Sequence, residues 1–254
     1  YPAVYTRTAQ IAGFNAASDN EQKEILKPFC GAEAFMVDEL CGARVGVSEQ
    51  EASRLCGHDN VKMTTVFGAE SEAESSQETY LRLLVDASTE KVIGAEALGR
   101  HVLPTIQLLS IAVLEGWHPQ KLVEIDAPYV NQWQAEFDPL KEAALRAKHA
   151  LKKSEFSLSH EQLALWLASK KPFHLVDVGE TSSFTVPSAE TMHVPLEQLR
   201  ERSDELLGLN EPVVLYAQSG DRSYMAHLAL RARGMKNVFH LDGGAATWNL
   251  VARE

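Results

Sequence analysis

The stretch Val213–Ser223 reads VVLYAQSGDRS, and it decides the fold of the second half of the chain. Its first four residues are apolar and rich in β-branched side chains, which is typical of a buried strand. A short loop follows, and Ser223 is a favourable N-cap for a helix that ends on Gly234. Such a strand, loop and helix start can cradle an anion, because backbone N–H groups converge where the helix dipole is positive.

The loop itself supplies the residues of this predicted anion site. Gly220 allows the backbone to turn so that its N–H groups point inward, and Arg222 offers a positively charged fork to an oxyanion. The first loop position usually carries a nucleophile, but here it is Ala217, which can attack nothing. An ordinary strand–helix turn is an equally good interpretation of these residues. The predicted anion-binding residues are Gln218, Ser219, Gly220, Asp221, Arg222 and Ser223.

The segments around this loop alternate between strands and helices with short connections. This pattern predicts a small parallel α/β sheet. Ligands of such sheets bind at the carboxyl ends of strands, which is where the loop lies. The predicted strands are Phe173–Val178, Val213–Tyr216 and Val238–Leu241, and the predicted helices follow Ser159 and cover Leu196–Leu207 and Ser223–Gly234.

Residues 1–150 follow a different pattern. Tyr80–Val85 and Val92–Leu98 flank a turn and predict a β-hairpin. Ser48 with Glu51 forms a capping box ahead of a helix over Gln50–Leu55. Further predicted elements are the end of a helix at Ala9–Ala17, one or two strands in Ile25–Val37, a strand at Val61–Phe67, and helices at Val102–Leu114 and Leu140–Leu151.

Length and charge limit the domain count and the class of partner. The 254 residues have room for one large domain or two small ones. A net charge of −11 argues against nucleic acid or an anionic membrane as a main partner. The charge balance is −9 in residues 1–150 and −2 in residues 151–254, and the charged run Lys148–Glu155 lies between them. We therefore predict domains at 21–150 and 151–254. The polar linker Asp19–Lys23 sets off a tail at 1–20.

The cysteines and histidines lack metal-ligand spacing. Cys30, Cys41 and Cys56 are best interpreted as free structural thiols in a reducing compartment, which predicts a cytoplasmic protein without a metal site. No stretch is apolar enough to span a bilayer, and no signal peptide is present. The chain starts at Tyr1 rather than Met, which is compatible with a piece of a longer protein.

The segment Val213–Trp248 resembles the second half of a rhodanese, a single-domain sulfurtransferase. It reads VVLYAQSGDRSYMAHLALRARGMKNVFHLDGGAATW. Phe173–Glu180 (FHLVDVGE) resembles the strand of that family that ends in Asp-Val-Arg, with Asp177 in the aspartate position, and MHVPLEQL at 192–199 resembles another family segment. The resemblance implies that Asp177 belongs with the loop residues of the site.

The departures from the rhodanese pattern concern its chemistry. The resemblance implies that the first loop residue is a cysteine that carries a persulfide, and here it is Ala217. The family's arginine after Asp-Val is Gly179, and its glycine and histidine are missing from Val186–Thr191. We therefore predict no sulfurtransferase activity. The additional losses favour natural degeneration over an engineered Cys-to-Ala change.

The first part of the chain is similar to the dimerisation domain of pyridine nucleotide-disulfide oxidoreductases. Leu81–Gly99 (LRLLVDASTEKVIGAEALG), Ala43–Ala52 (ARVGVSEQEA) and Glu115–Leu122 (EGWHPQKL) carry this resemblance in order. Tyr5–Ala17 resembles the last helix of the preceding flavin domain. A dimerisation domain followed by a rhodanese implies the C-terminal half of a coenzyme A-disulfide reductase or NADH-dependent persulfide reductase, and a homodimer.

This resemblance implies a fold, and it implies which part of the parent enzyme binds the cofactors. The expected fold is an α+β dimerisation domain with an antiparallel sheet, followed by a rhodanese-like α/β domain with a small parallel sheet. FAD and NAD(P)H, with coenzyme A as a further candidate, belong to the parent enzyme, and this chain holds none alone because the dinucleotide fingerprints are absent. Tyr129 falls on the family's flavin-site tyrosine, although a buried structural aromatic is an equal interpretation. The alternative is a free-standing, catalytically dead scaffold that pairs with another protein or binds an anion at 217–223.

Overall fold

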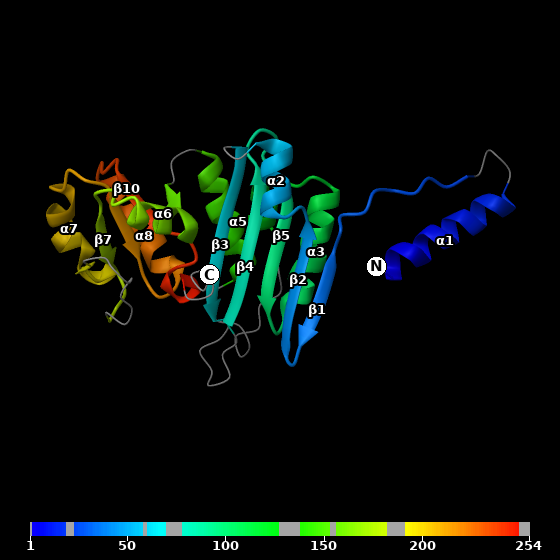
Figure 1. Cartoon of the computed structure of the whole chain (residues 1–254), viewed down its shortest axis with the longest axis horizontal. Coiled ribbons are helices and arrows are strands. Elements are labelled where there is room, and N and C mark those ends of the chain that lie inside the picture. Colours follow the sequence, from blue (N-terminus) through cyan, green and yellow to red (C-terminus); the bar gives the residue numbers. More distant parts are fainter. Residues whose placement is uncertain are drawn as a thin grey trace.

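A computed structural model describes residues 2–18, 23–57, 60–69, 78–126, 138–152, 156–181 and 191–248. These residues form two five-stranded sheets, one antiparallel and one parallel, each with helices packed on it. Figure 1 shows the sheets side by side, with β3 (Val61–Ala69) as the strand of the first sheet that lies nearest the second domain. The predicted fold class is confirmed.

The first sheet has the strand order β1-β2-β5-β4-β3 with antiparallel neighbours throughout. Helices α3 and α5 lie behind it in Figure 1, and α2 contacts β3 and β4. The strands are β1 (Glu33–Val37), β2 (Leu40–Gly46), β3, β4 (Glu78–Asp86) and β5 (Lys91–Gly99), and the helices are α1 (Pro2–Ala17), α2 (Glu49–Cys56), α3 (Val102–Leu114), α4 (Pro119–Val123) and α5 (Pro139–Leu151).

Helix α5 lies close to the first sheet because its inner face is made of small residues. Ala143, Ala144 and Ala147 are fully buried in the core beside Leu81 and Leu83 of β4. Burial of such apolar side chains is the main favourable contribution to folding. The close approach also brings a polar neighbour of these alanines, Arg146, up to the second domain.

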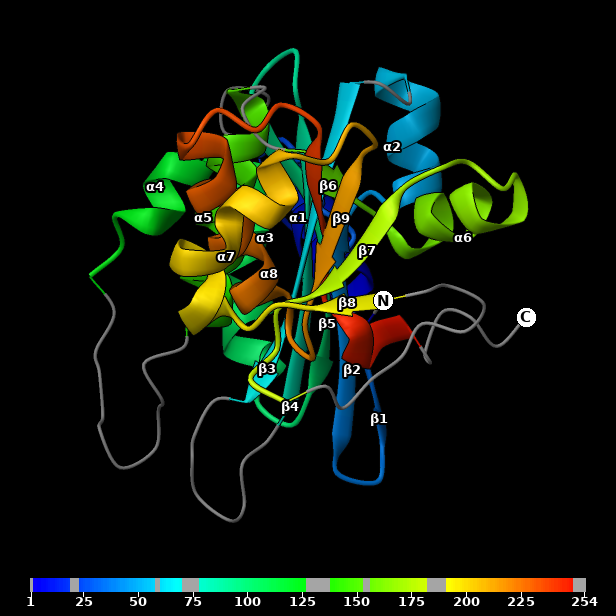
Figure 2. The same cartoon turned by 90° about the vertical axis from the view of Figure 1, so that its left-hand side faces the viewer.

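The second sheet has the order β6-β10-β9-β7-β8 and parallel pairing throughout. Its central strand β9 is fully buried, and helices cover both faces: α7 and α8 lie on one side and α6 on the other (Figure 2). The elements are β6 (Ser157–Leu158), α6 (His160–Ala168), β7 (His174–Asp177), β8 (Thr191–His193), η3 (Leu196–Gln198), α7 (Leu199–Leu207), β9 (Val213–Tyr216), α8 (Gly220–Ala232), β10 (Val238–Leu241) and η4 (Ala245–Thr247).

Several predicted elements are confirmed, and one helix start is wrong. Strand β9 has the predicted limits, and the capping boxes at Ser48 and Ser159 are both formed. Helix α8, however, begins at Gly220 with Ser219 as its N-cap, and not after Ser223. The Ser223 hydroxyl lies inside the first turn and donates to the Gly220 carbonyl, 2.9 Å away.

Other differences from the predictions concern short elements. In Ile25–Val37 only β1 is a strand, and residues 23–32 are irregular. Strands β2, β6 and β8 and helix α4 were not predicted, and the Leu196–Leu207 helix starts as the 3-10 turn η3. Helix α5 continues to Leu151, within the predicted boundary segment, and residues 153–155 lie outside the described part. The limits 20/21 and 150/151 therefore stay predictions.

Candidate functional site

The loop after β9 is packed tightly against a second glycine-containing turn. Ala217 is fully buried, and its carbonyl accepts a hydrogen bond of 2.8 Å from the Ala245 N–H. The Ala246 N–H donates to Gln218 in the same way, over 3.0 Å. Gly244 has a φ of 72°, and a Cβ added there would lie 2.5 Å from the Ser219 carbonyl carbon. A side chain at this glycine would therefore push the loop out of place.

Arg222 points to a carboxylate of its own domain. Its Nη2 atom lies 2.6 and 2.7 Å from the two carboxylate oxygens of Glu197, and its Nε donates to the Val178 carbonyl over 3.2 Å. These hydrogen bonds hold the pKa of Glu197 below its usual range. The predicted anion fork is thus already engaged by an internal anion.

Asp221 points in the opposite direction, to the first domain. Its carboxylate accepts a hydrogen bond of 2.5 Å from Nη2 of Arg146, a fully buried residue of α5. Burial raises the pKa of Asp221, and the Arg146 charge opposes this shift. This contact could not be predicted from the sequence, because the two residues are 75 positions apart and belong to different domains.

Asp177 lies at the carboxyl end of β7, next to the end of β9. It is in register with Tyr216, and its side chain accepts a 2.8 Å hydrogen bond from the Gly179 N–H. Burial raises the pKa of the Asp177 carboxyl. Asp177 therefore ends its strand level with the last residue of β9 and is bonded to its own turn, and its part in an anion site stays a prediction. Tyr129 lies outside the described residues.

The sequence of this site departs from the rhodanese pattern at the position of the cysteine. Ala217 ends in a methyl group, and the Ser223 hydroxyl is bonded within α8. The three cysteines of the chain all precede residue 57 and belong to the first part of the sequence. A covalent persulfide at this loop would require a thiolate there.

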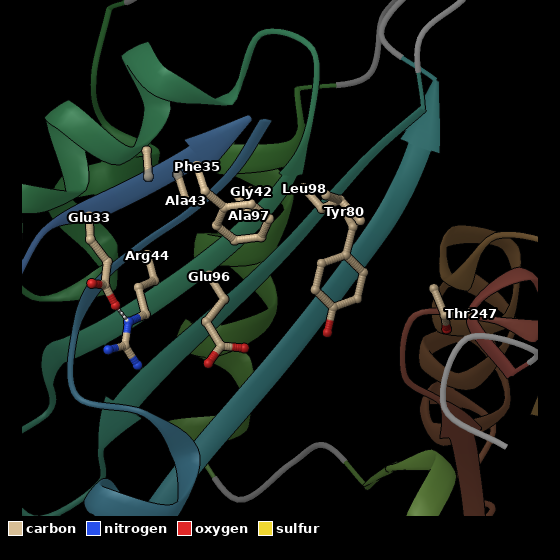
Figure 3. A pocket seen from close by; sticks show the side chains of 11 residues that line it. Glu33, Phe35, Gly42, Ala43, Arg44, Tyr80, Glu96, Ala97, Leu98 and Thr247 are labelled. Carbon is tan, nitrogen blue, oxygen red and sulfur yellow. Dashed lines mark hydrogen bonds and ion pairs between the residues drawn. The ribbon is translucent and has the colours of Figure 1, made fainter. Parts of the chain in front are cut away.

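A separate cavity of about 630 Å³ lies on the free face of the first sheet (Figure 3). One cross-strand row there alternates in charge and runs in register from Glu33 through Arg44 and Glu96 to Arg82. Arg44 forms an ion pair with Glu33, and Arg82 lies 3.8 Å from Glu96. The four charges therefore compensate one another.

The neighbouring row of this face is apolar. It comprises Phe35, Gly42, Leu98 and Tyr80, in register across the same four strands. Burial raises the pKa of Tyr80 to about 12. Thr247 of the second domain lines the same cavity (Figure 3). The cavity includes none of the residues of the predicted site. It could not be predicted from the sequence, because β2, which lines it, was not among the predicted strands.

Two further properties concern the described part of the chain. Within it, no cluster of three or more histidine, cysteine or acidic side chains is arranged to hold a metal ion. Likewise, none of the described helices is long and apolar enough to cross a membrane.

Comparison with known families identifies both domains. Residues 34–128 match the dimerisation domain of the pyridine nucleotide-disulphide oxidoreductases. Residues 159–250 match the rhodanese-like domain. The chain therefore combines a pyridine nucleotide-disulphide oxidoreductase dimerisation domain with a rhodanese-like domain, as the sequence resemblance indicated.

The arrangement of the two domains matches the C-terminal part of two larger solved proteins. The NAD-dependent persulfide reductase from A. fulgidus is 24% identical, with a TM-score of 0.76, over 89% of this chain and 41% of that protein. The CoADR-RHD protein from Bacillus anthracis is 19% identical, with a TM-score of 0.79, over 90% of this chain and 41% of that protein. At these identities the comparison shows a shared fold.

A curated relative covers a smaller region. The uncharacterized protein YqhL from Bacillus subtilis (strain 168) is 33% identical over 82 residues, which are 32% of this chain and 64% of that protein. The chain thus spans less than two thirds of this relative and about two fifths of the two solved structures.

Proposed function

We propose that the chain is the dimerisation and rhodanese-like portion of a flavin-dependent NAD(P)H disulfide or persulfide reductase of the coenzyme A-disulfide type. The order of the two domains, and the fold shared with a persulfide reductase and with CoADR-RHD, support this proposal. In this portion the first domain pairs with a second copy of the chain to form a homodimer.

The rhodanese-like domain of this portion does not carry sulfur. The observation behind this statement is Ala217, which stands at the first position of the loop between β9 and α8 and has no ionisable group. A loop of backbone amides can lower the pKa of a thiol and stabilise a thiolate, but it cannot replace the nucleophile itself. The loop therefore keeps the strand–loop–helix order of such a site without the residue for its covalent chemistry.

The cofactors belong to the missing half of the proposed enzyme. FAD and NAD(P)H supply hydride chemistry in such reductases, and coenzyme A is a further candidate ligand. The described residues do not fit a dinucleotide, because their strand–loop–helix unit at 217–220 lacks a G-x-G-x-x-G fingerprint. Tyr129 is the residue of this chain that would reach the flavin site of the partner subunit. No step of hydride transfer is assigned to the other residues.

The sulfurtransferase assay tests the inactive loop directly. The purified chain, given thiosulfate and cyanide, should release no thiocyanate above the uncatalysed background, because no residue at position 217 can accept the sulfane sulfur. Release above background, lost again in Arg222→Ala, would contradict the proposal. The intact mass and the visible spectrum of native material test whether the chain is part of a flavin-dependent reductase. A yellow protein of about twice this length is expected.

A scaffold or regulatory module is the second candidate, and the charge pairing of the loop favours it. Asp221 and Arg222 are both neutralised by residues of this chain, Arg146 and Glu197. A loop whose charges are paired within the chain can have a purely structural role. A colourless native protein of this length would support the scaffold. For either function, light scattering that shows a stable monomer at micromolar concentration would argue against the pairing of the first domain.

A further inference from the structure

A fully buried guanidinium lies between the two domains. Arg146 projects from α5 of the first domain, and its side chain has no exposed surface. A buried charge is tolerated only where partners replace the water that it loses. The partners of Arg146 therefore reveal what holds this interface together.

Each nitrogen of the guanidinium contacts a different structural element. Nε donates to Glu142 of the same helix over 2.8 Å, and Nη1 donates to the Thr65 carbonyl of β3 over 3.3 Å. Nη2 donates to Asp221 of α8, over 2.5 Å. The guanidinium carbon also lies 5.0 Å from the centre of the Tyr224 ring. Two of these four partners belong to the second domain.

The backbone around this contact leaves room for the guanidinium and little else. A Cβ added to Gly220 would lie 2.9 Å from Nη1 of Arg146, so a larger residue could not start α8 here without displacing the arginine. On the other side, the buried carboxylate of Asp242 accepts a 2.6 Å hydrogen bond from the Thr65 N–H. Strand β3 is therefore bonded to the second domain by its backbone as well.

We propose that Arg146 is a positioning residue that fixes the first turn of α8, and with it the 217–223 loop, to the dimerisation domain. If the loop turned away from α5, the Arg146 guanidinium and the Asp221 carboxylate would lose each other as partners. Separating such a charge pair inside a protein is strongly unfavourable. The two domains therefore unfold as one cooperative unit. This inference depends on the interface geometry and not on the proposed enzymatic function.

Hydrogen exchange and calorimetry of the complete chain test the inference. Arg146→Met keeps the length and the apolar part of the side chain but removes the charge. We expect amide exchange in the α8 first turn, Gly220–Ser223, to rise by about 100-fold. The single thermal transition should also split, with the second domain melting about 10 °C lower. The matched control is Glu205→Gln, which removes the charge of an exposed pair inside α7, leaves the Arg202 bond to the His193 carbonyl, and should change neither measurement.

The readout in α8 separates a positioning role from a local one. If Arg146 only stabilised the first domain, Arg146→Met would raise exchange in α5 and β3 while α8 kept its wild-type protection, and this result would overturn the inference. Two separate transitions in the wild-type chain would overturn it as well.

A change on the other side of the interface keeps the test decisive if Arg146→Met does not fold. Asp221→Asn preserves the shape and removes the charge, and Arg146→Lys keeps the charge without the three-way fork. Both should raise exchange in α8, and the double variant Arg146→Met/Asp221→Asn should cost less than the two single changes added together. Wild-type exchange in α8 of Asp221→Asn would contradict the proposal.

Discussion

Two adjacent residues in the first turn of α8, Asp221 and Arg222, are both ion-paired but in opposite surroundings. Asp221 meets Arg146, whose side chain is 0% exposed and belongs to the other domain. Arg222 meets Glu197, whose side chain is 60% exposed and belongs to the same domain. Asp221 itself is 31% exposed, so water and salt screen the second pair more strongly than the first. The Asp221 side of the loop therefore belongs to the interface between the domains. The Arg222 side remains open to exchange with solvent ions.

This difference bears on what the loop can still do. Releasing Asp221 would disrupt the contact between the domains, so that side is not available to a ligand. Releasing Arg222 requires only that an external anion replace Glu197, at a small cost for an exposed pair. Any remaining anion binding should therefore depend on Arg222 and on the N–H groups of the α8 first turn.

The largest expected effect is on the free energy of unfolding, and it should differ between the two ion pairs. Arg146→Met should lower the free energy of unfolding of the second domain by about 3–5 kcal/mol, because it leaves the partly buried Asp221 carboxylate without its cation. Glu197→Gln should leave the denaturant midpoint unchanged, because its pair is exposed. Urea unfolding of both variants checks this comparison. Equal midpoints for the two variants would show that burial does not separate the pairs.

A second effect concerns pH at the buried side of α8. His240 is fully buried, and burial lowers its pKa to about 4 from an ordinary 6.5. The folded chain keeps this ring neutral while the unfolded chain takes up a proton, so stability should decrease by about 3 kcal/mol as the pH falls from about 6.5 to about 4. The groups that face it are the rings of Tyr224 and His227 and the charged Asp242, Arg146 and Glu142.

Urea unfolding as a function of pH measures this slope. His240→Gln, which stays neutral, should flatten the curve between pH 4 and 6.5. The matched control is His174→Gln, at the partly exposed pair with Glu211, which should leave the slope close to wild type. An unchanged slope in His240→Gln would show that other groups produce the acid sensitivity.

The smallest effect concerns anion binding at the exposed side. Glu197→Gln frees the Arg222 guanidinium and should tighten the binding of thiosulfate by about fivefold, as expected for loss of a competing exposed carboxylate. Calorimetric titration measures the affinity, and Glu205→Gln, which frees Arg202 instead, provides the control. If Glu197→Gln binds thiosulfate no better than wild type, Arg222 is not part of an anion site.

Sequence reasoning succeeded where local patterns decide the structure. β9 was predicted with its observed limits because four apolar residues between Pro212 and a small-residue loop have one good solution, a buried strand. The capping box of Ser48 and Glu51 is a local hydrogen-bonding unit and was predicted for the same reason. The two domain resemblances identified the fold class.

Prediction from the sequence failed where contacts between residues distant in sequence decide the structure. Ser223 is a favourable N-cap by residue type, but the helix starts earlier because Gly220 packs against Arg146 and the 243–244 turn. The partner of Arg222 in the folded chain, Glu197, lies 25 positions away and was not predicted. Such contacts depend on how the two sheets and their helices come together, which no window of sequence contains.

The measurement that tests the central claim most directly is the sulfurtransferase activity of Ala217→Cys. The claim is that this loop is no longer a transfer site, because Arg222 is engaged by Glu197 and the family's residues at Gly179 and at 186–191 are also replaced. With thiosulfate and cyanide, Ala217→Cys should stay at least about 100-fold below an intact single-domain rhodanese, and Ala217→Ser should show none. Activity equal to that of the intact rhodanese would contradict the claim.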